Sequence, residues 1–124
     1  MALAALVTAR EHDQQYDWTM AELTAIKDGL APGVIDVVRN RATLTGLGEK
    51  EAAIVQFGRE LFGQHYVTAQ TYARALQLFG LRDLSDIVTG VMAQHARDAV
   101  ILTAFDQRLP EGQKPLLPVA ARRR

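Results

Sequence analysis

Apolar residues recur at intervals of three and four along nearly the whole chain, and the strict alternation of half-buried strands is almost absent. This period places apolar side chains on one face of an α-helix, and it constrains the fold more than any other feature of the sequence. With 124 residues, of which 48% are hydrophobic and 23% charged, the chain suits one domain with its own core. The sequence therefore predicts a single all-α domain, a bundle of five or six helices.

Capping residues and helix breakers divide the chain into predicted helices. Asp13 is the expected N-cap of the second helix, Gly29 ends that helix, Gly48 precedes the fourth, and Thr68 and Gly80 bound the fifth. The predicted ranges are Leu3–Arg10, Gln14–Asp28, Gly33–Arg39 with Pro32 in its first turn, a helix that begins at Glu49, Ala69–Phe79, and a long last helix from Leu84 to about Arg108. The expected inner side of the last helix consists of Ile87, Val88, Val91, Met92, His95, Ala99, Leu102 and Phe105. The tail that follows is expected to be extended, because it contains Pro110, Pro115 and Pro118.

Composition excludes several classes of function. The chain has no cysteine, which removes disulfides, thiolate metal sites and thiol nucleophiles. Fourteen Lys and Arg balance fourteen Asp and Glu, so no general attraction to nucleic acid or to acidic membranes is expected. The only basic run, Arg122–Arg124, falls in an expected solvated tail (119–124) that follows a domain over 1–118. The apolar opening Met1–Val7 is too short for a secretion signal or a membrane span, and a cytoplasmic protein is expected.

Five stretches, taken together, resemble one family. They are Gln14–Trp18, Gly29–Leu30, Gly48–Ala53, Thr71–Leu76, and Leu102–Asp106 with the proline-rich tail. Their order and spacing are similar to those of the carboxymuconolactone decarboxylase family, which includes the alkyl hydroperoxidase D-like proteins, over about residues 3–118. The resemblance implies an all-helical fold of that type, assembly into homotrimers or homohexamers, and a site beside the helix that begins near Asp13. Family members generally begin further upstream, so the chain is expected to be shortened at its N-terminus.

The reactive groups of the peroxidase branch of this family are missing. That branch carries a Cys-x-x-Cys pair followed by a His, with an upstream Glu that relays protons. The corresponding positions here are Gln14 and Asp17 for the thiols, Ala21 for the His and Ala2 for the Glu, so a thiol peroxidase is excluded by chemistry. Another branch has Tyr-Glu-Trp-x-x-His at the same place. The stretch Tyr16–Trp18 resembles it with Asp for Glu, but Ala21 again stands where the His belongs.

Decarboxylation of a lactone acid needs an electron sink and a general acid for the carbanion that forms. Tyr16, Asp17 and His95 are the candidate catalytic residues, with Trp18 and Arg10 as candidate substrate-binding residues and Arg10 as the partner of a substrate carboxylate. The alternatives are a charge at a helix N-terminus for Asp17, a core position for Trp18, and a neutral histidine with one hydrogen bond for His95.

Three histidines without a short-range partner pattern do not favour a metal site, and neither a metal nor a cofactor is expected. His12 is expected to be solvated at a polar junction, and His65 to lie near a helix C-terminus. Arg97 and Asp98, in the middle of the last helix, predict either an ion pair between subunits or an exposed surface.

Two classes of function remain. The first is a cofactor-free lyase that acts on a small lactone or carboxylic acid. The second is a non-catalytic oligomeric binding or scaffold member of the family. A closed, polar-lined cavity beside Tyr16 would favour the enzyme, and solid packing there would favour the scaffold.

Overall fold

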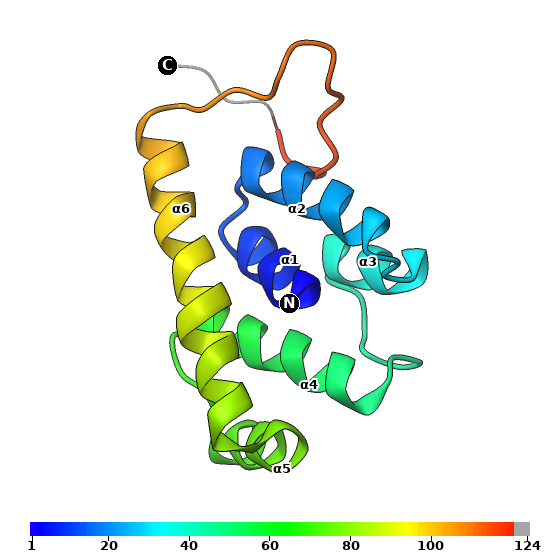
Figure 1. Cartoon of the computed structure of the whole chain (residues 1–124), viewed down its shortest axis with the longest axis vertical. Helices are drawn as coiled ribbons and strands as arrows, with labels where there is room; N and C mark the ends of the chain where they lie inside the picture. The colour runs from blue at the N-terminus through cyan, green and yellow to red at the C-terminus, as the bar shows by residue number, and fades with distance from the viewer. Residues whose placement is uncertain (121–124) are drawn as a thin grey trace.

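The computed structural model describes residues 1–120, and residues 121–124 lie outside the described part. Within residues 1–120 the chain forms helices and no strand, which confirms the predicted all-α class (Figure 1). Two π-helical segments continue α4 and α5. The elements are α1 (Ala2–Glu11), α2 (Gln15–Lys27), α3 (Pro32–Arg39), α4 (Glu49–Gly58), η1 (Arg59–Gln64), α5 (Ala69–Asp86), η2 (Ile87–Met92) and α6 (Ala93–Ala104).

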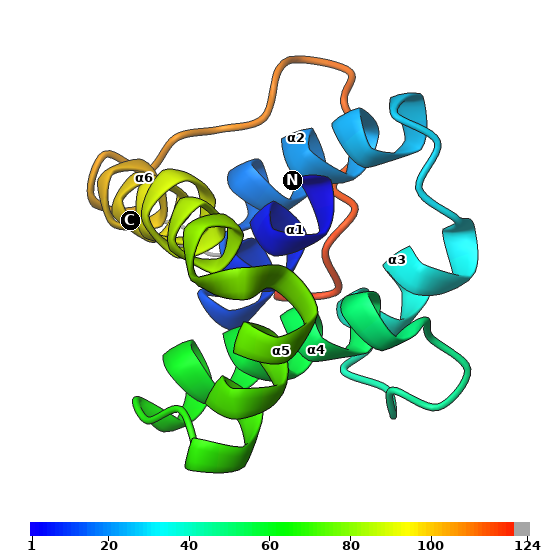
Figure 2. The same cartoon turned by 60° about the horizontal axis from the view of Figure 1, so that its bottom comes forward.

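The first helix, α1, is the centre of the fold. Every residue from Leu3 to Arg10 is buried, and α1 contacts α2, α3, α4, α6 and both π-helical segments. The other helices surround it in both views (Figures 1 and 2). A helix that is mainly apolar on all sides is stable only in an interior. The closest approach is to the end of α4, where a Cβ added to Gly58 would lie 2.7 Å from Val7 Cγ1.

Most helix ends follow from the capping residues read in the sequence. Thr68 Oγ1 accepts a hydrogen bond from the Thr71 backbone N–H (3.2 Å) at the start of α5, and Gly48 is the N-cap of α4. Gly29 (φ +86°) follows α2 in the left-handed region, where a residue without Cβ is favoured. Gly80 (φ +76°) interrupts α5, so that its first part ends at residue 79 as predicted.

The last helical rod differs from the prediction at both ends. Helical structure resumes at residue 81 and runs through η2 and α6 as one long rod to Ala104, rather than from Leu84 to Arg108 (Figure 1). Phe105, predicted to face inward, is 78% exposed. It lies beyond the last helical residue, and Asp106 turns into the left-handed region (φ +49°), so the helical period no longer sets its direction.

The described tail, residues 105–120, contains no helix and returns from the end of α6 across α2 (Figures 1 and 2). Leu117 is 4% exposed and belongs to the hydrophobic core. The expected boundary between residues 118 and 119 therefore falls inside a docked segment. Of the predicted basic tail, only Val119 and Ala120 are described, and the arginine run lies outside the described residues.

Candidate functional site

A buried carboxylate and a histidine from distant parts of the chain meet between α2 and α6. Asp17 lies in the first turn of α2, and His95 is the third residue of α6. His95 Nδ1 lies 2.8 Å from Asp17 Oδ1 and 3.0 Å from Oδ2. Asp17 is 7% exposed, whereas the His95 side chain keeps 26% of its surface exposed. Two of the three candidate catalytic residues are therefore in direct contact.

The contact with Asp17 favours the protonated form of the His95 imidazole and determines which ring nitrogen donates to the carboxylate. The hydrogen bond to Asp17 raises the pKa of His95, burial opposes the increase, and the charges of Asp17 and Asp98 add to it. An ionised carboxylate only accepts hydrogen bonds, so Nδ1 is the donor in the pair. The other ring nitrogen, Nε2, is thereby left as the atom that can give or take a proton.

Gln14 connects Asp17 to the far end of α6. Gln14 is the N-cap of α2, and its Oε1 accepts the backbone N–H of Asp17 at 3.1 Å. Its Nε2 donates to Thr103 Oγ1 at 3.2 Å. The same side chain therefore caps the N-terminus of α2 and joins it to the C-terminal end of α6. Sequence reasoning missed this role, although Gln14 occupies one of the thiol positions of the resembled family.

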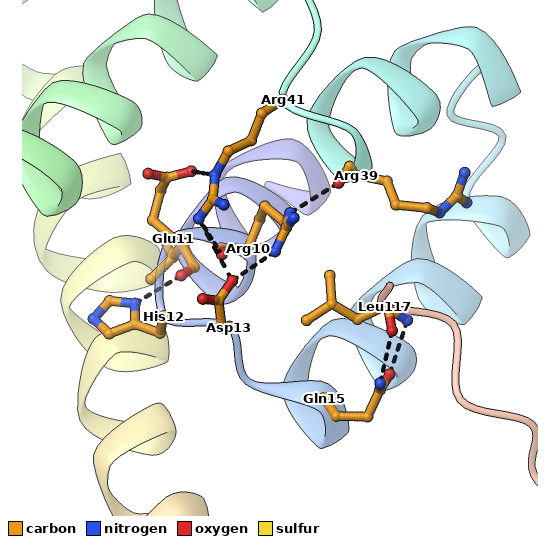
Figure 3. A network of polar contacts seen from close by, with 9 residues as sticks. Arg10, Glu11, His12, Asp13, Gln15, Arg39, Arg41 and Leu117 are labelled. Carbon is orange, nitrogen blue, oxygen red and sulfur yellow. Dashed lines mark hydrogen bonds and ion pairs between the residues drawn. The ribbon is translucent and has the colours of Figure 1, made fainter. Parts of the chain in front are cut away.

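Asp13 does not cap α2, and the prediction that it does was wrong. Its backbone has φ +49°, and its carboxylate is bound by two arginines that sequence spacing alone did not connect (Figure 3). Arg10 Nη1 lies 2.6 Å from Asp13 Oδ1, and Arg41 Nη2 lies 3.5 Å from the same atom. Arg41 Nε also donates to Glu11 Oε2 at 3.2 Å. The junction between α1 and α2 is therefore an ion-pair network.

The two candidate substrate-binding residues both have partners within the fold. Arg10 is 8% exposed, and besides Asp13 its Nε donates to the backbone carbonyl of Arg39 at 2.8 Å (Figure 3). Trp18 is fully buried, and its Nε1–H donates to Glu22 Oε1 at 3.1 Å. Glu22 in turn accepts from Arg39 Nη2 at 2.6 Å, which ties α2 to α3. Neither Arg10 nor Trp18 lines the cavity described next.

Tyr16 borders a half-open cavity of about 430 Å³. One wall comes from the α1–α2 junction, a second from the end of α6 and the following turn, and a third from the tail. The residues that line it are His12, Asp13, Gln14, Gln15, Tyr16, Leu102, Thr103, Asp106, Gln107, Arg108, Leu109, Pro115, Leu117, Val119 and Ala120. Asp17 and His95 do not line this cavity; Gln14, which caps Asp17, does. Among these lining residues, Arg108 is the one arginine.

The remaining histidines form no metal site among the described residues, since no group of three or more metal-ligating side chains is found in residues 1–120. The ring of His12, expected to be solvated, packs edge-on against Phe62 (centroids 4.9 Å apart), and its Nδ1 lies 2.7 Å from the Thr8 carbonyl oxygen. His65 follows η1 in the left-handed region.

No described helix has the length and hydropathy that crossing a membrane requires. Comparison of the chain with protein-family models, with curated proteins and with solved structures found no match.

Proposed function

We propose that the chain is a cofactor-free acid–base catalyst, a lyase that acts on a small lactone or carboxylic acid. The observation that carries this proposal is the Asp17–His95 pair, a buried carboxylate bonded to a partly exposed imidazole at 2.8 Å. Such a pair is a recurrent means of setting the tautomer and basicity of a catalytic histidine. The resemblance to the carboxymuconolactone decarboxylase family, which remains an expectation from the sequence because no family model matches, would imply the same reaction class.

In the proposed reaction the bond between the carboxylate and its carbon breaks and carbon dioxide leaves. The electron pair moves into the conjugated carbonyl system, and Nε2 of protonated His95 delivers a proton to carbon. Because Asp17 raises the pKa of His95, a larger fraction of the ring carries this proton near neutral pH. His95 then regains a proton from solvent. No metal or redox group is needed for these steps.

His95 does not line the cavity beside Tyr16, so in this proposal the cavity holds the part of the substrate that does not react, and the reacting carbon lies at the exposed edge of His95. The cavity volume of about 430 Å³ lies in the range of small-molecule sites, and polar groups stand among its apolar walls. Arg108 takes the place that the sequence assigned to Arg10, as the group that holds a substrate carboxylate, which would replace Asp106 as its partner. Gln14 links this cavity to Asp17 through the hydrogen bond that caps α2.

Turnover of a panel of lactone acids by the wild type and by three variants tests the proposal. His95→Gln and Asp17→Asn are expected to lower kcat by about 10²-fold or more, the range of general acid–base catalysis. Tyr16→Phe is expected to have a smaller effect. The control is His65→Asn, since His65 shares no hydrogen bond with Asp17 or His95, and asparagine suits its left-handed backbone. Activity that is insensitive to the three site changes would contradict the assignment.

A second candidate, the non-catalytic oligomeric member of the family, is favoured by three exposed apolar side chains on α6 and just beyond its end. Val100, Ile101 and Phe105 are 65%, 47% and 78% exposed. Exposed apolar side chains that gather in a patch mark surfaces that pair with other proteins. This candidate requires a homotrimer or homohexamer without turnover, and light scattering should detect that assembly. A mass of 13.7 kDa, that of one chain, would exclude it.

A further inference from the structure

Hydrogen bonds from two side chains of α2 to the backbone of Leu116 and Leu117 hold the tail on that helix. Gln15 Nε2 donates to the Leu117 carbonyl at 2.8 Å, and Gln15 Oε1 accepts the Leu117 N–H at 2.8 Å (Figure 3). The Leu116 N–H lies 3.1 Å from the same Oε1 and 3.2 Å from Thr19 Oγ1. Thr19 Oγ1 donates to Gln15 Oε1 at 2.8 Å, which holds the amide in place. One glutamine thus pairs with both backbone groups of Leu117, as a neighbouring strand would.

An apolar contact accompanies the backbone contacts. Leu117 is 4% exposed and packs into the core, and Leu116 and Val119 pack against it at partial exposure. Burial of one leucine side chain contributes about 1.5–3 kcal/mol, which is comparable to several net hydrogen bonds. Leu117 is therefore the side chain that anchors the segment.

Two prolines prepare this segment for docking. Pro115 and Pro118 flank the anchoring residues, and a residue that precedes proline is restricted to extended backbone. Leu117 precedes Pro118, so less conformational entropy is lost when it docks. Because proline has no backbone N–H, Pro115 and Pro118 leave no unpaired donor when the segment docks.

Within residues 105–115, the hydrogen bonds and ion pairs join residues that are close in the sequence. Gln113 N–H donates to the Pro110 carbonyl at 3.0 Å, and Arg108 pairs with Asp106 at 2.8 Å. Within residues 105–120, the hydrogen bonds that join side chains or backbone of the tail to α2 are those of Leu116 and Leu117. The hydrogen bonds between residues 105–120 and α2 are therefore confined to one place, around Gln15 and Thr19.

We infer that the face of α2 around Gln15 and Thr19 is a peptide-recognition surface, that residues 115–119 are its ligand within the same chain, and that undocking of this segment opens the cavity beside Tyr16. The segment supplies Pro115, Leu117 and Val119 to the cavity wall, so the cavity loses one side when the segment leaves. This inference does not depend on the proposed catalysis, since it concerns a peptide contact and access to a cavity.

Amide hydrogen exchange of the wild-type chain tests whether the segment undocks by itself. The Leu116 and Leu117 amides are expected to exchange at least tenfold faster than those of Ile54 and Met92 in the core helices. They should exchange through a local opening, so their exchange rates should not change when a low concentration of urea is added. Exchange of all four amides through the same global opening would overturn the inference. Complete lack of protection at Leu116 and Leu117 would overturn it as well, because the segment would then not be docked.

A synthetic peptide with the sequence of residues 114–119, labelled with a fluorophore, tests recognition. In the wild type the attached segment competes at an effective concentration of the order of millimolar. The peptide is therefore expected to bind a Leu117→Ser chain at least tenfold more tightly than the wild type. Adding Gln15→Leu should weaken this binding at least tenfold, whereas the matched change Gln113→Leu should not. Absence of binding to the Leu117→Ser chain, or equal affinity with and without Gln15, would refute the inference.

Discussion

Replacing Gly58 by alanine tests the packing of α1 against α4. The added Cβ would lie 2.7 Å from Val7 Cγ1 and 2.8 Å from Cγ2, whereas carbon atoms in van der Waals contact are about 3.5–4.0 Å apart. Val7 is fully buried, and a β-branched side chain in a helix has one strongly preferred rotamer, so the backbones must separate. Overpacking of this kind costs about 1–3 kcal/mol, and alanine recovers up to about 1 kcal/mol in helix propensity. The free energy of unfolding should fall by about 1–2 kcal/mol and Tm by roughly 5–10 °C.

Urea unfolding followed by circular dichroism measures this change, and Gly90→Ala is the matched control. An added Cβ at Gly90 meets no atom within 4 Å, so this helical glycine should tolerate alanine without loss of stability. In a Val7→Ala background the contacts at 2.7 and 2.8 Å are removed and only the contact with the Cβ at 3.3 Å remains, so Gly58→Ala should cost less, which gives a coupling energy of about 1 kcal/mol. An equal cost of Gly58→Ala in both backgrounds would refute this reasoning.

Three further predictions concern ionisable groups. Burial alone would raise the pKa of Glu60, but hydrogen bonds from Thr71, Gln56 and Thr68 outweigh it and lower the pKa to about 2. The stability that ionised Glu60 contributes is therefore present above pH 4.5 and is lost as the pH falls toward 2. After allowance for solvent screening it amounts to about 1–2 kcal/mol. Glu60→Gln should therefore reduce the fall in the free energy of unfolding at acidic pH, measured by urea unfolding at several pH values. The pKa of His95 is raised, so its pairing with Asp17 stabilises the fold below pH 6.5 and less as the pH rises through the folded pKa; Asp17→Asn should cost more stability at pH 5.5 than at pH 9. Asp98→Ala should lower the pKa of His95 in an NMR titration, because the charge of Asp98 raises it; unchanged stability and oligomer mass in this variant would exclude an intersubunit ion pair at Asp98.

The fold class and most helix ends were predictable because they depend on local chemistry. Thr68 offers a hydroxyl to backbone N–H groups a turn away, and Gly29 and Gly80 accept a backbone that other residues avoid. Asp13 failed as a predicted cap because its carboxylate is taken by Arg10 and by Arg41, which lies 28 residues away along the chain. The spacing of residues along the sequence does not show whether a distant arginine competes with a nearby helix N-terminus for the same carboxylate.

The candidate site was predictable in part. Asp17 and His95 were both singled out, but their contact joins residues 78 positions apart and depends on how α2 packs against α6. The docking of Leu117 on Gln15 was missed for the same reason, with 102 positions between the two residues. The π-helical segments were not predicted either, because each is six residues long, too short to show an apolar period of its own.

The distance along the chain between Gln15 and Leu117 has a consequence during synthesis. At roughly 5–20 residues per second, a ribosome needs about 5–20 s to proceed from one to the other. Throughout that interval the Gln15 side chain lacks the Leu117 backbone as a partner, and the apolar surface that Leu117 covers in the folded chain stays open to solvent.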